Sequence, residues 1–145
     1  MEIIKLKAGE CMGDWRIGTA SDDFRKQLNV PFRALEEERD TLYEGYHRPA
    51  FDYFPALGLK AEYDQEGNVS FLEVDRRHKL HWEGGFLFEH NMADWLLAVK
   101  KKGKVEMFDL GFSLPQLGIS FYSRHFGPES PDVDVELISI FKPEN

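Results

Sequence analysis

The stretch "PALGLKAEYDQEG" (residues 55–67) has a counterpart later in the chain, "PQLGISFYSRHFG" (residues 115–127). A Pro, a Leu, a Gly, an aliphatic residue and a closing Gly coincide at the same spacing in both blocks. Each block follows a segment with helix signals and precedes a segment rich in strand-forming residues. The sequence therefore predicts one order of elements, strand, helix and antiparallel hairpin, repeated twice.

Strand periodicity surrounds both blocks. Leu57, Leu59, Ala61 and Tyr63 alternate with glycine or polar residues, which is the pattern of a half-buried strand. The segment "DQEGN" then predicts a turn, and "VSFLEV" predicts the returning strand of a hairpin. The other strand-like segments are "KLHWEGGFLF" (79–88), "KVEMFDLGFSL" (104–114), "LGISFYS" (117–123) and "VDVELISIF" (133–141).

Two segments have the signals of short helices. In the first, Thr19 or Ser21 is expected to cap the helix, Phe24 and Leu28 form its apolar stripe, and Pro31 ends it. In the second, Asn91 is the expected cap, and the buried face is formed by Met92, Trp95, Leu96 and Val99.

These elements predict an α+β fold in a single domain over residues 1–145. Its mainly antiparallel sheet carries both helices on one face. The strand-helix-hairpin unit is expected to be a tandem duplication, with pseudo-repeats at residues 12–75 and 79–142.

The segment "IGTASDDFRKQLNVP" (17–31) resembles a motif of the small outer-membrane assembly lipoproteins, Gly-x-Ser/Thr followed by Leu-Gly-x-Pro. Asn29 stands where that motif has a glycine. A tandem layout of the same kind occurs in the fold of the β-lactamase-inhibitory protein, which this chain also resembles. The resemblance implies a helix packed on an antiparallel sheet and a function in binding other proteins.

Composition narrows the possible partners. The 145 residues are 42% hydrophobic, 14% aromatic and 30% charged, with a formal net charge of −8. A surface of this sign repels nucleic acids and anionic membranes and attracts a basic protein. The chain has one cysteine, Cys11, and no apolar segment resembling a signal peptide or a membrane span, so a cytoplasmic protein is expected.

The histidine-containing hairpin "RRHKLHWEGGFLFEH" (76–90) is the densest cluster of chemical groups. His78 and His81 are an odd number of residues apart, so they point to opposite faces of a strand. His81 and Glu83 share a face but offer only two ligands, whereas a metal site needs three or four. With no nucleophile elbow and no phosphate-binding loop in the sequence, we expect no metal, no cofactor and no catalytic residue.

The segment "TLYEGYHRPAFDYFPA" (41–56) keeps neither a helical nor a strand period, and it is expected to be a loop. Tyr and Arg side chains often anchor protein interfaces, because they combine apolar area with directed hydrogen bonds. The candidate partner-binding residues here are Tyr43, Tyr46, His47, Arg48 and Tyr53. The alternative is a loop folded over the sheet with its rings buried.

Acidic residues cluster at the start of the last predicted strand. Asp132, Asp134 and Glu136 alternate with Val133 and Val135, so their carboxylates are expected on the solvent face. Together with Glu129 they form a second candidate partner-binding group. The alternative role for these charges is to discourage aggregation between strands.

The sequence as a whole predicts a non-catalytic protein-binding module. The most specific hypothesis is an inhibitor or immunity-type protein that masks a basic partner, as a bacterial immunity protein masks a toxin. One alternative is a small-ligand or metal-dependent enzyme that uses His47, His78, His81 or His90. Another is an oligomeric structural subunit whose exposed strands pair between copies, and the sequence leaves the oligomeric state open.

Overall fold

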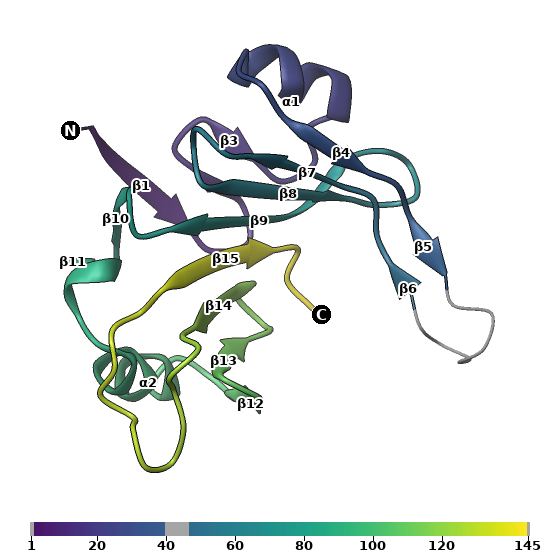
Figure 1. Cartoon of the computed structure of the whole chain (residues 1–145). Helices are drawn as coiled ribbons and strands as arrows, with labels where there is room; N and C mark the ends of the chain where they lie inside the picture. The colour runs from purple at the N-terminus through teal and green to yellow at the C-terminus, as the bar shows by residue number, and fades with distance from the viewer. Residues whose placement is uncertain (1, 40–46, 145) are drawn as a thin grey trace.

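The computed structural model describes residues 2–39 and 47–144, which form helices and sheets of an α+β fold (Figure 1). The helical elements in this part of the chain are α1 (Ser21–Leu28), the single 3₁₀ turn η1 (Leu87–Glu89) and α2 (Met92–Lys100). Both α-helices are therefore predicted by the sequence. The 3₁₀ turn occupies the end of the segment 79–88, which was predicted to be strand.

The largest sheet has eight strands, and every neighbouring pair in it is antiparallel. Its spatial order is β12 (Glu106–Phe108), β13 (Gly111–Leu114), β14 (Ile119–Tyr122), β15 (Leu137–Phe141), β9 (Val69–Asp75), β8 (Leu59–Tyr63), β7 (Phe51–Phe54) and β4 (Arg33–Leu35). The β15–β9 pair lies at the centre and joins strands that are far apart in the sequence.

Two smaller sheets complete the fold. The five-stranded sheet has the order β11 (Gly85–Phe86), β10 (Lys79–Trp82), β1 (Ile3–Lys7), β2 (Cys11–Met12) and β3 (Trp15–Arg16). The two-stranded sheet pairs β5 (Glu38–Arg39) with β6 (His47–Arg48). Only β1 and β10 run parallel among the paired strands of the described chain, so the prediction of a mainly antiparallel architecture is confirmed.

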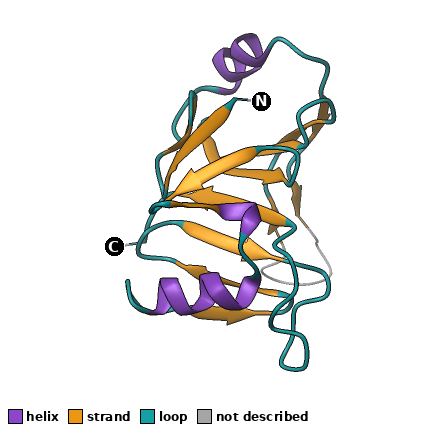
Figure 2. Ribbon diagram, turned by 90° about the vertical axis from the view of Figure 1, so that its left-hand side faces the viewer, coloured by secondary structure: helices purple, strands orange, loops and turns teal. Residues whose placement is uncertain are grey.

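Both helices pack on the same face of the eight-stranded sheet, as Figure 2 shows from the helical side. Phe24 of α1 meets Phe54 of β7 at a ring-centroid distance of 5.9 Å, and Trp95 of α2 stacks on Phe121 of β14 at 5.8 Å. The strand register places Phe54 and Phe121 on one face of the sheet, together with the other fully buried strand residues. The side chains on that face belong to the hydrophobic core. They include Leu59, Ala61, Leu72, Val74, Phe112, Leu114, Ile119, Ile138 and Ile140.

The two helices begin in different ways. Asn91 caps α2 as predicted, because its side-chain oxygen accepts a hydrogen bond of 2.9 Å from the backbone N–H of Asp94. The cap predicted for α1 is wrong: its N-cap residue is Ala20, which has no side chain able to accept a hydrogen bond. The hydroxyl of Thr19 instead donates to the carbonyl oxygen of Arg16 at 2.9 Å.

The two Pro-x-Leu-Gly steps form the turns of two hairpins, β7–β8 and β13–β14. Gly58 has a φ of +54° and Gly118 a φ of +77°, a left-handed conformation that L side chains rarely adopt. The spacing shared by the two blocks thus corresponds to a shared local geometry.

Replacing Gly118 by alanine is expected to lower the free energy of unfolding by more than the about 1–3 kcal/mol that backbone strain alone costs. Besides the unfavourable φ, an added Cβ would lie 2.0 Å from the carbonyl oxygen of Phe141 and 2.9 Å from the Cα of Gly9. Gly67→Ala is the matched control, because Gly67 has a φ of +81° but nothing within 4 Å of an added Cβ. Equal losses in urea unfolding for the two variants would refute the role of the contact at Gly118.

Candidate protein-binding face

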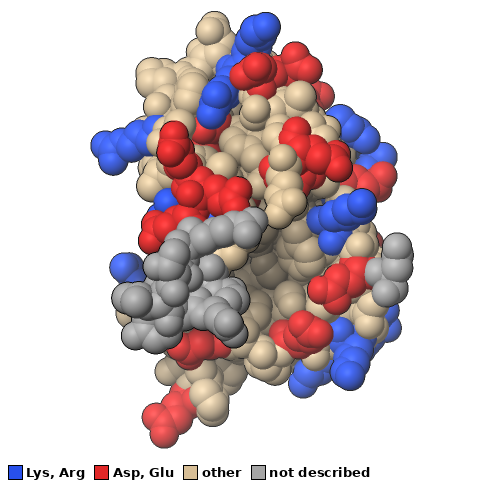
Figure 3. All heavy atoms as spheres, turned by 90° about the vertical axis from the view of Figure 1, so that its right-hand side faces the viewer, with Lys and Arg blue, Asp and Glu red and all other residues tan. Residues whose placement is uncertain are grey.

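The eight-stranded sheet has a second face, opposite the helices, which we call the open face. Its side chains follow from the strand register, since directly paired residues point to the same side. The open face consists of Arg33, Leu35, Phe51, Tyr53, Lys60, Glu62, Phe71, Glu73, Asp75, Glu106, Phe108, Ser113, Ser120, Tyr122, Leu137, Ser139 and Phe141. Figure 3 looks onto this side of the molecule, where the surface is hollowed in the middle and both acidic and basic side chains lie around the hollow.

Large apolar side chains are exposed at both ends of the open face. At one end, Leu35 of β4 and Tyr53 of β7 are each 37% exposed. At the other end, Phe108 of β12 is 45% exposed. Exposed apolar side chains that flank a broad surface are typical of a site for another macromolecule.

Small polar residues line the middle of the open face. Ser113, Ser120 and Ser139 are paired across β13, β14 and β15, so their short side chains lie side by side. The hydroxyls of Ser120 and Ser139 are hydrogen-bonded to each other. Ser139 is only 4% exposed, so the neighbouring side chains close over it.

Two ion pairs involve charged residues of the open face. Lys60 forms an ion pair of 3.1 Å with Glu62, and its ammonium lies 4.6 Å from the centroid of the Phe51 ring. Asp75 forms an ion pair of 2.9 Å with Arg77. Both pairs are partly solvent-exposed, so they contribute little to the stability of the fold.

The aromatic segment predicted as a loop is instead largely extended where the structure describes it. His47 and Arg48 form β6, and residues 51–54 form β7, because pairing with β5, β4 and β8 imposes a strand on a sequence without clear periodicity. Of the candidate residues, Tyr53 lies on the open face. Tyr43 and Tyr46 lie outside the described residues.

His47 and Arg48 contact the acidic segment that follows β4. The ring nitrogen Nε2 of His47 lies 2.8 Å from Oε1 of Glu37. Arg48 donates a hydrogen bond of 2.9 Å to the carbonyl oxygen of Glu36 and forms an ion pair of 3.1 Å with Glu38. These contacts hold β5 and β6 together at the side of the sheet.

The second candidate group does not lie on a strand, which corrects the sequence prediction. The strand β15 begins at Leu137, and the acids precede it in the connection from β14. The predicted alternation holds in part: Val135 is fully buried and Asp132 and Asp134 are exposed, but Glu136 is half-buried. Glu129 is exposed in the same connection.

Asp132, Asp134 and Glu136 line a surface pocket of about 470 Å³ together with Arg76. Asp134 lies 3.9 Å from Arg76, and Glu136 accepts a 2.7 Å hydrogen bond from the backbone N–H of Arg124. Neither Tyr53 nor any other member of the open face lines this pocket. The two candidate groups therefore belong to different surfaces.

The histidines of the 76–90 hairpin are packed against rings and backbone. His78 is hydrogen-bonded to the carbonyl oxygen of Leu57 and meets Trp15 edge to face, whereas His81 meets Phe86 in a similar way. His90 contacts Trp95 edge to face at 5.6 Å. Within residues 2–39 and 47–144, no group of three or more His, Cys, Asp or Glu side chains is placed to hold a metal ion.

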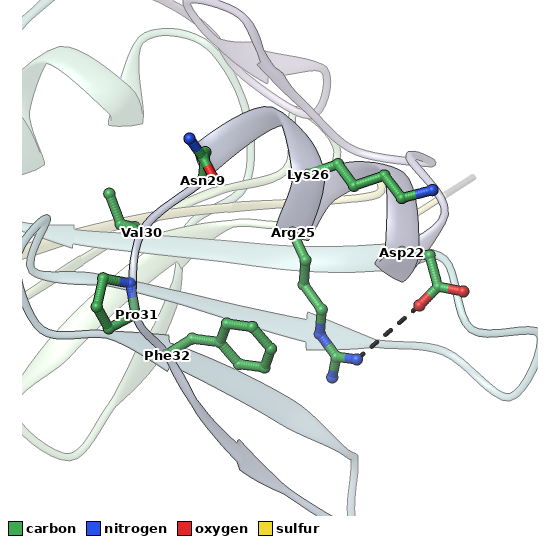
Figure 4. A pocket seen from close by; sticks show the side chains of 7 residues that line it. All are labelled: Asp22, Arg25, Lys26, Asn29, Val30, Pro31 and Phe32. Carbon is green, nitrogen blue, oxygen red and sulfur yellow. Dashed lines mark ion pairs between the residues drawn. The ribbon is translucent and has the colours of Figure 1, made fainter.

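Another pocket, of about 610 Å³, lies beside α1 (Figure 4). It is lined by Asp22, Arg25, Lys26, Asn29, Val30, Pro31 and Phe32. The guanidinium group of Arg25 already has protein partners. It donates two hydrogen bonds, of 2.6 and 2.8 Å, to the buried Asp52, and it lies 4.7 Å from the centroid of the Phe32 ring. The hydrogen bond to Asp52 raises the pKa of Arg25, so the side chain joins α1 to β7 as a permanent cation.

Tyr63 completes this buried cluster. Its hydroxyl donates a hydrogen bond of 2.6 Å to Asp52, and burial together with that bond raises the pKa of the hydroxyl. Sequence reasoning missed the cluster, since Arg25 and Asp52 are 27 positions apart and no local pattern connects them. The cluster anchors the end of the sheet that carries Tyr53.

Comparison with known proteins found no matching family model, no similar curated protein and no similar solved structure. In the described chain, no helix has the length and apolar composition needed to cross a membrane. The function must therefore be argued from the site itself.

Proposed function

We propose that this chain is a non-catalytic protein-binding module, of the inhibitor or immunity type, that masks a basic partner protein with its open face. The observation that supports this most directly is the sheet face itself. It is broad, it carries exposed Leu35, Tyr53 and Phe108 at its ends, and it has no helix packed on it in the described structure. Aromatic side chains in such a position supply most of the binding energy in protein interfaces.

Charge supports a basic partner. The chain carries a net charge of −8. The open face follows this bias, with carboxylates on Glu62, Glu73, Asp75 and Glu106 against cations on Arg33 and Lys60. A basic partner would be steered toward this surface, and the association rate would fall as salt screens the charges.

The proposal predicts that Tyr53→Ala and Phe108→Ala each weaken partner binding by about 5–30-fold, corresponding to about 1–2 kcal/mol per anchoring side chain. The partner is first isolated from native lysate at low salt, and its affinity for each variant is then measured by titration calorimetry. Both residues are partly exposed, so the melting temperature of each variant should stay close to that of the wild type.

Leu97→Ala is the matched control, because Leu97 is 64% exposed but lies on α2, away from the open face. It should leave the affinity unchanged. Normal binding by both open-face variants, or an equal loss with Leu97→Ala, would contradict the open face as the binding surface.

The oligomeric alternative is favoured by one observation, the exposed edge strand β12. All three of its residues are exposed, and Met107 on its core side is 57% exposed. An unpaired edge of this kind can pair with a strand of a second copy. A strictly monomeric mass in light scattering across the micromolar range would exclude this alternative.

We also infer that the fold arose by tandem duplication. The inference is supported by the two Pro-x-Leu-Gly hairpins and by a chain order in which β4, β7, β8 and β9 run inward from one edge, as β12, β13, β14 and β15 do from the other. A duplicated body would give the open face two similar halves.

We propose the cytoplasm as the place of action. The support is chemical: the one cysteine of the chain, Cys11, is buried as a free thiol, which suits a reducing compartment.

A further inference from the structure

Glu73 occupies the middle of the open face. It lies on β9, directly between Lys60 of β8 and Ser139 of β15. The side chain is half-buried, and this burial is the main reason that the pKa of the Glu73 carboxyl is raised above its ordinary value. The nearby Lys60 lowers the pKa and Glu62 raises it, with smaller effects.

The groups around Glu73 already have other partners. Lys60 pairs with Glu62 at 3.1 Å, and the hydroxyl of Ser139 is hydrogen-bonded to Ser120. Asp75, two positions along β9, is held by Arg77 at 2.9 Å. In the part of the chain that the structure describes, no hydrogen bond or ion pair reaches the Glu73 carboxylate.

A half-buried carboxylate without a hydrogen-bond donor is partly desolvated, and the attraction of Lys60 offsets this cost only in part. A charged N–H donor from outside would remove this penalty and form a strong, charge-assisted hydrogen bond. The serine beside Glu73 on β15, Ser139, carries no charge that would compete for such a group.

We propose that Glu73 is the cation socket of the open face, which receives an arginine or lysine side chain from the basic partner. The inference rests on the proposed function and makes it more specific. The net charge attracts a basic partner to the surface as a whole, whereas this proposal places the recognition of a cation at one half-buried carboxylate at its centre. The exposed side chains of Tyr53 and Phe108 would then contact the partner on either side of this polar centre.

Small probes test the socket without the partner. Isotope-labelled protein is titrated with Nα-acetyl-arginine amide, Nα-acetyl-lysine amide and, as the uncharged isostere of arginine, Nα-acetyl-citrulline amide. NMR follows the backbone amides of β8, β9 and β15 and the side-chain carboxyl carbon of Glu73. At least one cationic probe should give saturable shifts centred on these strands and lower the pKa of Glu73, and citrulline should give none.

The test variant is Glu73→Gln, and its matched control is Glu106→Gln, an exposed glutamate at the edge of the same face. Glu73→Gln should weaken binding of the cationic probe by about tenfold or more, as expected for the loss of a charged hydrogen bond. It should also raise the melting temperature of the free protein by about 2–4 °C at neutral pH, because a partly desolvated charge is removed. Glu106→Gln should change neither.

The charge of Glu73 also makes probe binding depend on pH. The charged groups facing it are Lys60 and Glu62 from β8 and Asp75 from its own strand, whereas β15 contributes only the Ser139 hydroxyl. Only the ionised carboxylate binds a cation, so binding should be lost as the pH falls through the raised pKa of Glu73. The stabilising effect of Glu73→Gln should shrink over the same range, because protonation removes the buried charge from the wild type.

No saturable shift with either cationic probe, or equal binding by wild type and Glu73→Gln, would overturn the socket. Partner binding separates this failure from that of the proposed function. If the isolated basic partner binds wild type and Glu73→Gln equally while Tyr53→Ala weakens it, the socket is wrong and the open face stands.

Discussion

Replacing Asp52 by alanine is expected to lower the free energy of unfolding by about 1–3 kcal/mol, the usual cost of removing the acceptor of buried hydrogen bonds. Asp52 is fully buried, and its carboxylate accepts hydrogen bonds of 2.6 and 2.8 Å from Arg25 and one of 2.6 Å from Tyr63. Without it, the buried Tyr63 hydroxyl and the Arg25 guanidinium, whose side chain is 32% exposed, lose their acceptor. The loss is measured by urea unfolding followed by circular dichroism.

Asp22→Ala is the matched control for this prediction. Asp22 also faces Arg25, but at 4.0 Å and with a side chain that is 85% exposed. Because exposed ion pairs contribute little, this variant should change the free energy of unfolding by no more than about 1 kcal/mol. Similar losses for the two aspartates would mean that burial of the Arg25–Asp52 pair is not what stabilises this end of the sheet.

Replacing Phe121 by alanine is expected to cost about 3–5 kcal/mol, the range for large-to-small changes of a buried aromatic side chain. Phe121 is fully buried, with ring centroids of Phe112 at 5.0 Å, Trp95 at 5.8 Å and Trp82 at 6.4 Å. The variant would leave a cavity between α2 and the sheet and would remove ring contacts that join three elements. Chemical unfolding and the loss of the near-ultraviolet tryptophan signal report the change.

Phe108→Ala provides the comparison for the second prediction. Phe108 lies on β12 in the same half of the sheet, but its side chain is on the open face and 45% exposed. Its removal should alter the free energy of unfolding by about 0.5 kcal/mol or less, as surface substitutions usually do. A loss as large as that of Phe121→Ala would place Phe108 in the core and remove it from the candidate binding face.

Elements with a clear period could be predicted from the sequence. The burial of Phe24, Trp95 and Val99 follows from helical spacing, and the half-buried β8 follows from simple alternation. Asn91 was recognised as a cap because its hydrogen bond is local. In each case the deciding interaction lies within a few residues of the pattern.

Interactions across the fold could not be predicted in this way. Asp52 stands between two aromatic residues, and nothing near it in the sequence indicates that its partners are Arg25 and Tyr63. The acids 132–136 alternate like strand residues, but the strand begins only at Leu137, and Asp134 forms no more than an isolated antiparallel bridge with Asn91. Local alternation predicts exposure, whereas strand formation also needs a neighbouring strand in register.

The candidate site, too, could be predicted from the sequence only in part. Tyr53 was found from composition, since an aromatic-rich segment suggests an interface. Phe108 and Glu73 were missed, because only the order of the strands places them on one face of the sheet. No spacing rule connects β12, β9 and β7, which are brought together by the long-range pairing of β15 with β9.

That central pairing also constrains how the protein can be made. At ~5–20 residues per second, a ribosome needs roughly 3–13 s to proceed from Glu73 to its cross-strand partner Ser139. Throughout that interval β9 is an unpaired edge, open to strands of other nascent chains. The carboxylates of Glu73 and Asp75 then discourage wrong pairing, as charged residues on exposed edges generally do. The same acids that give the finished surface its charge thus protect the unfinished chain from aggregation during synthesis.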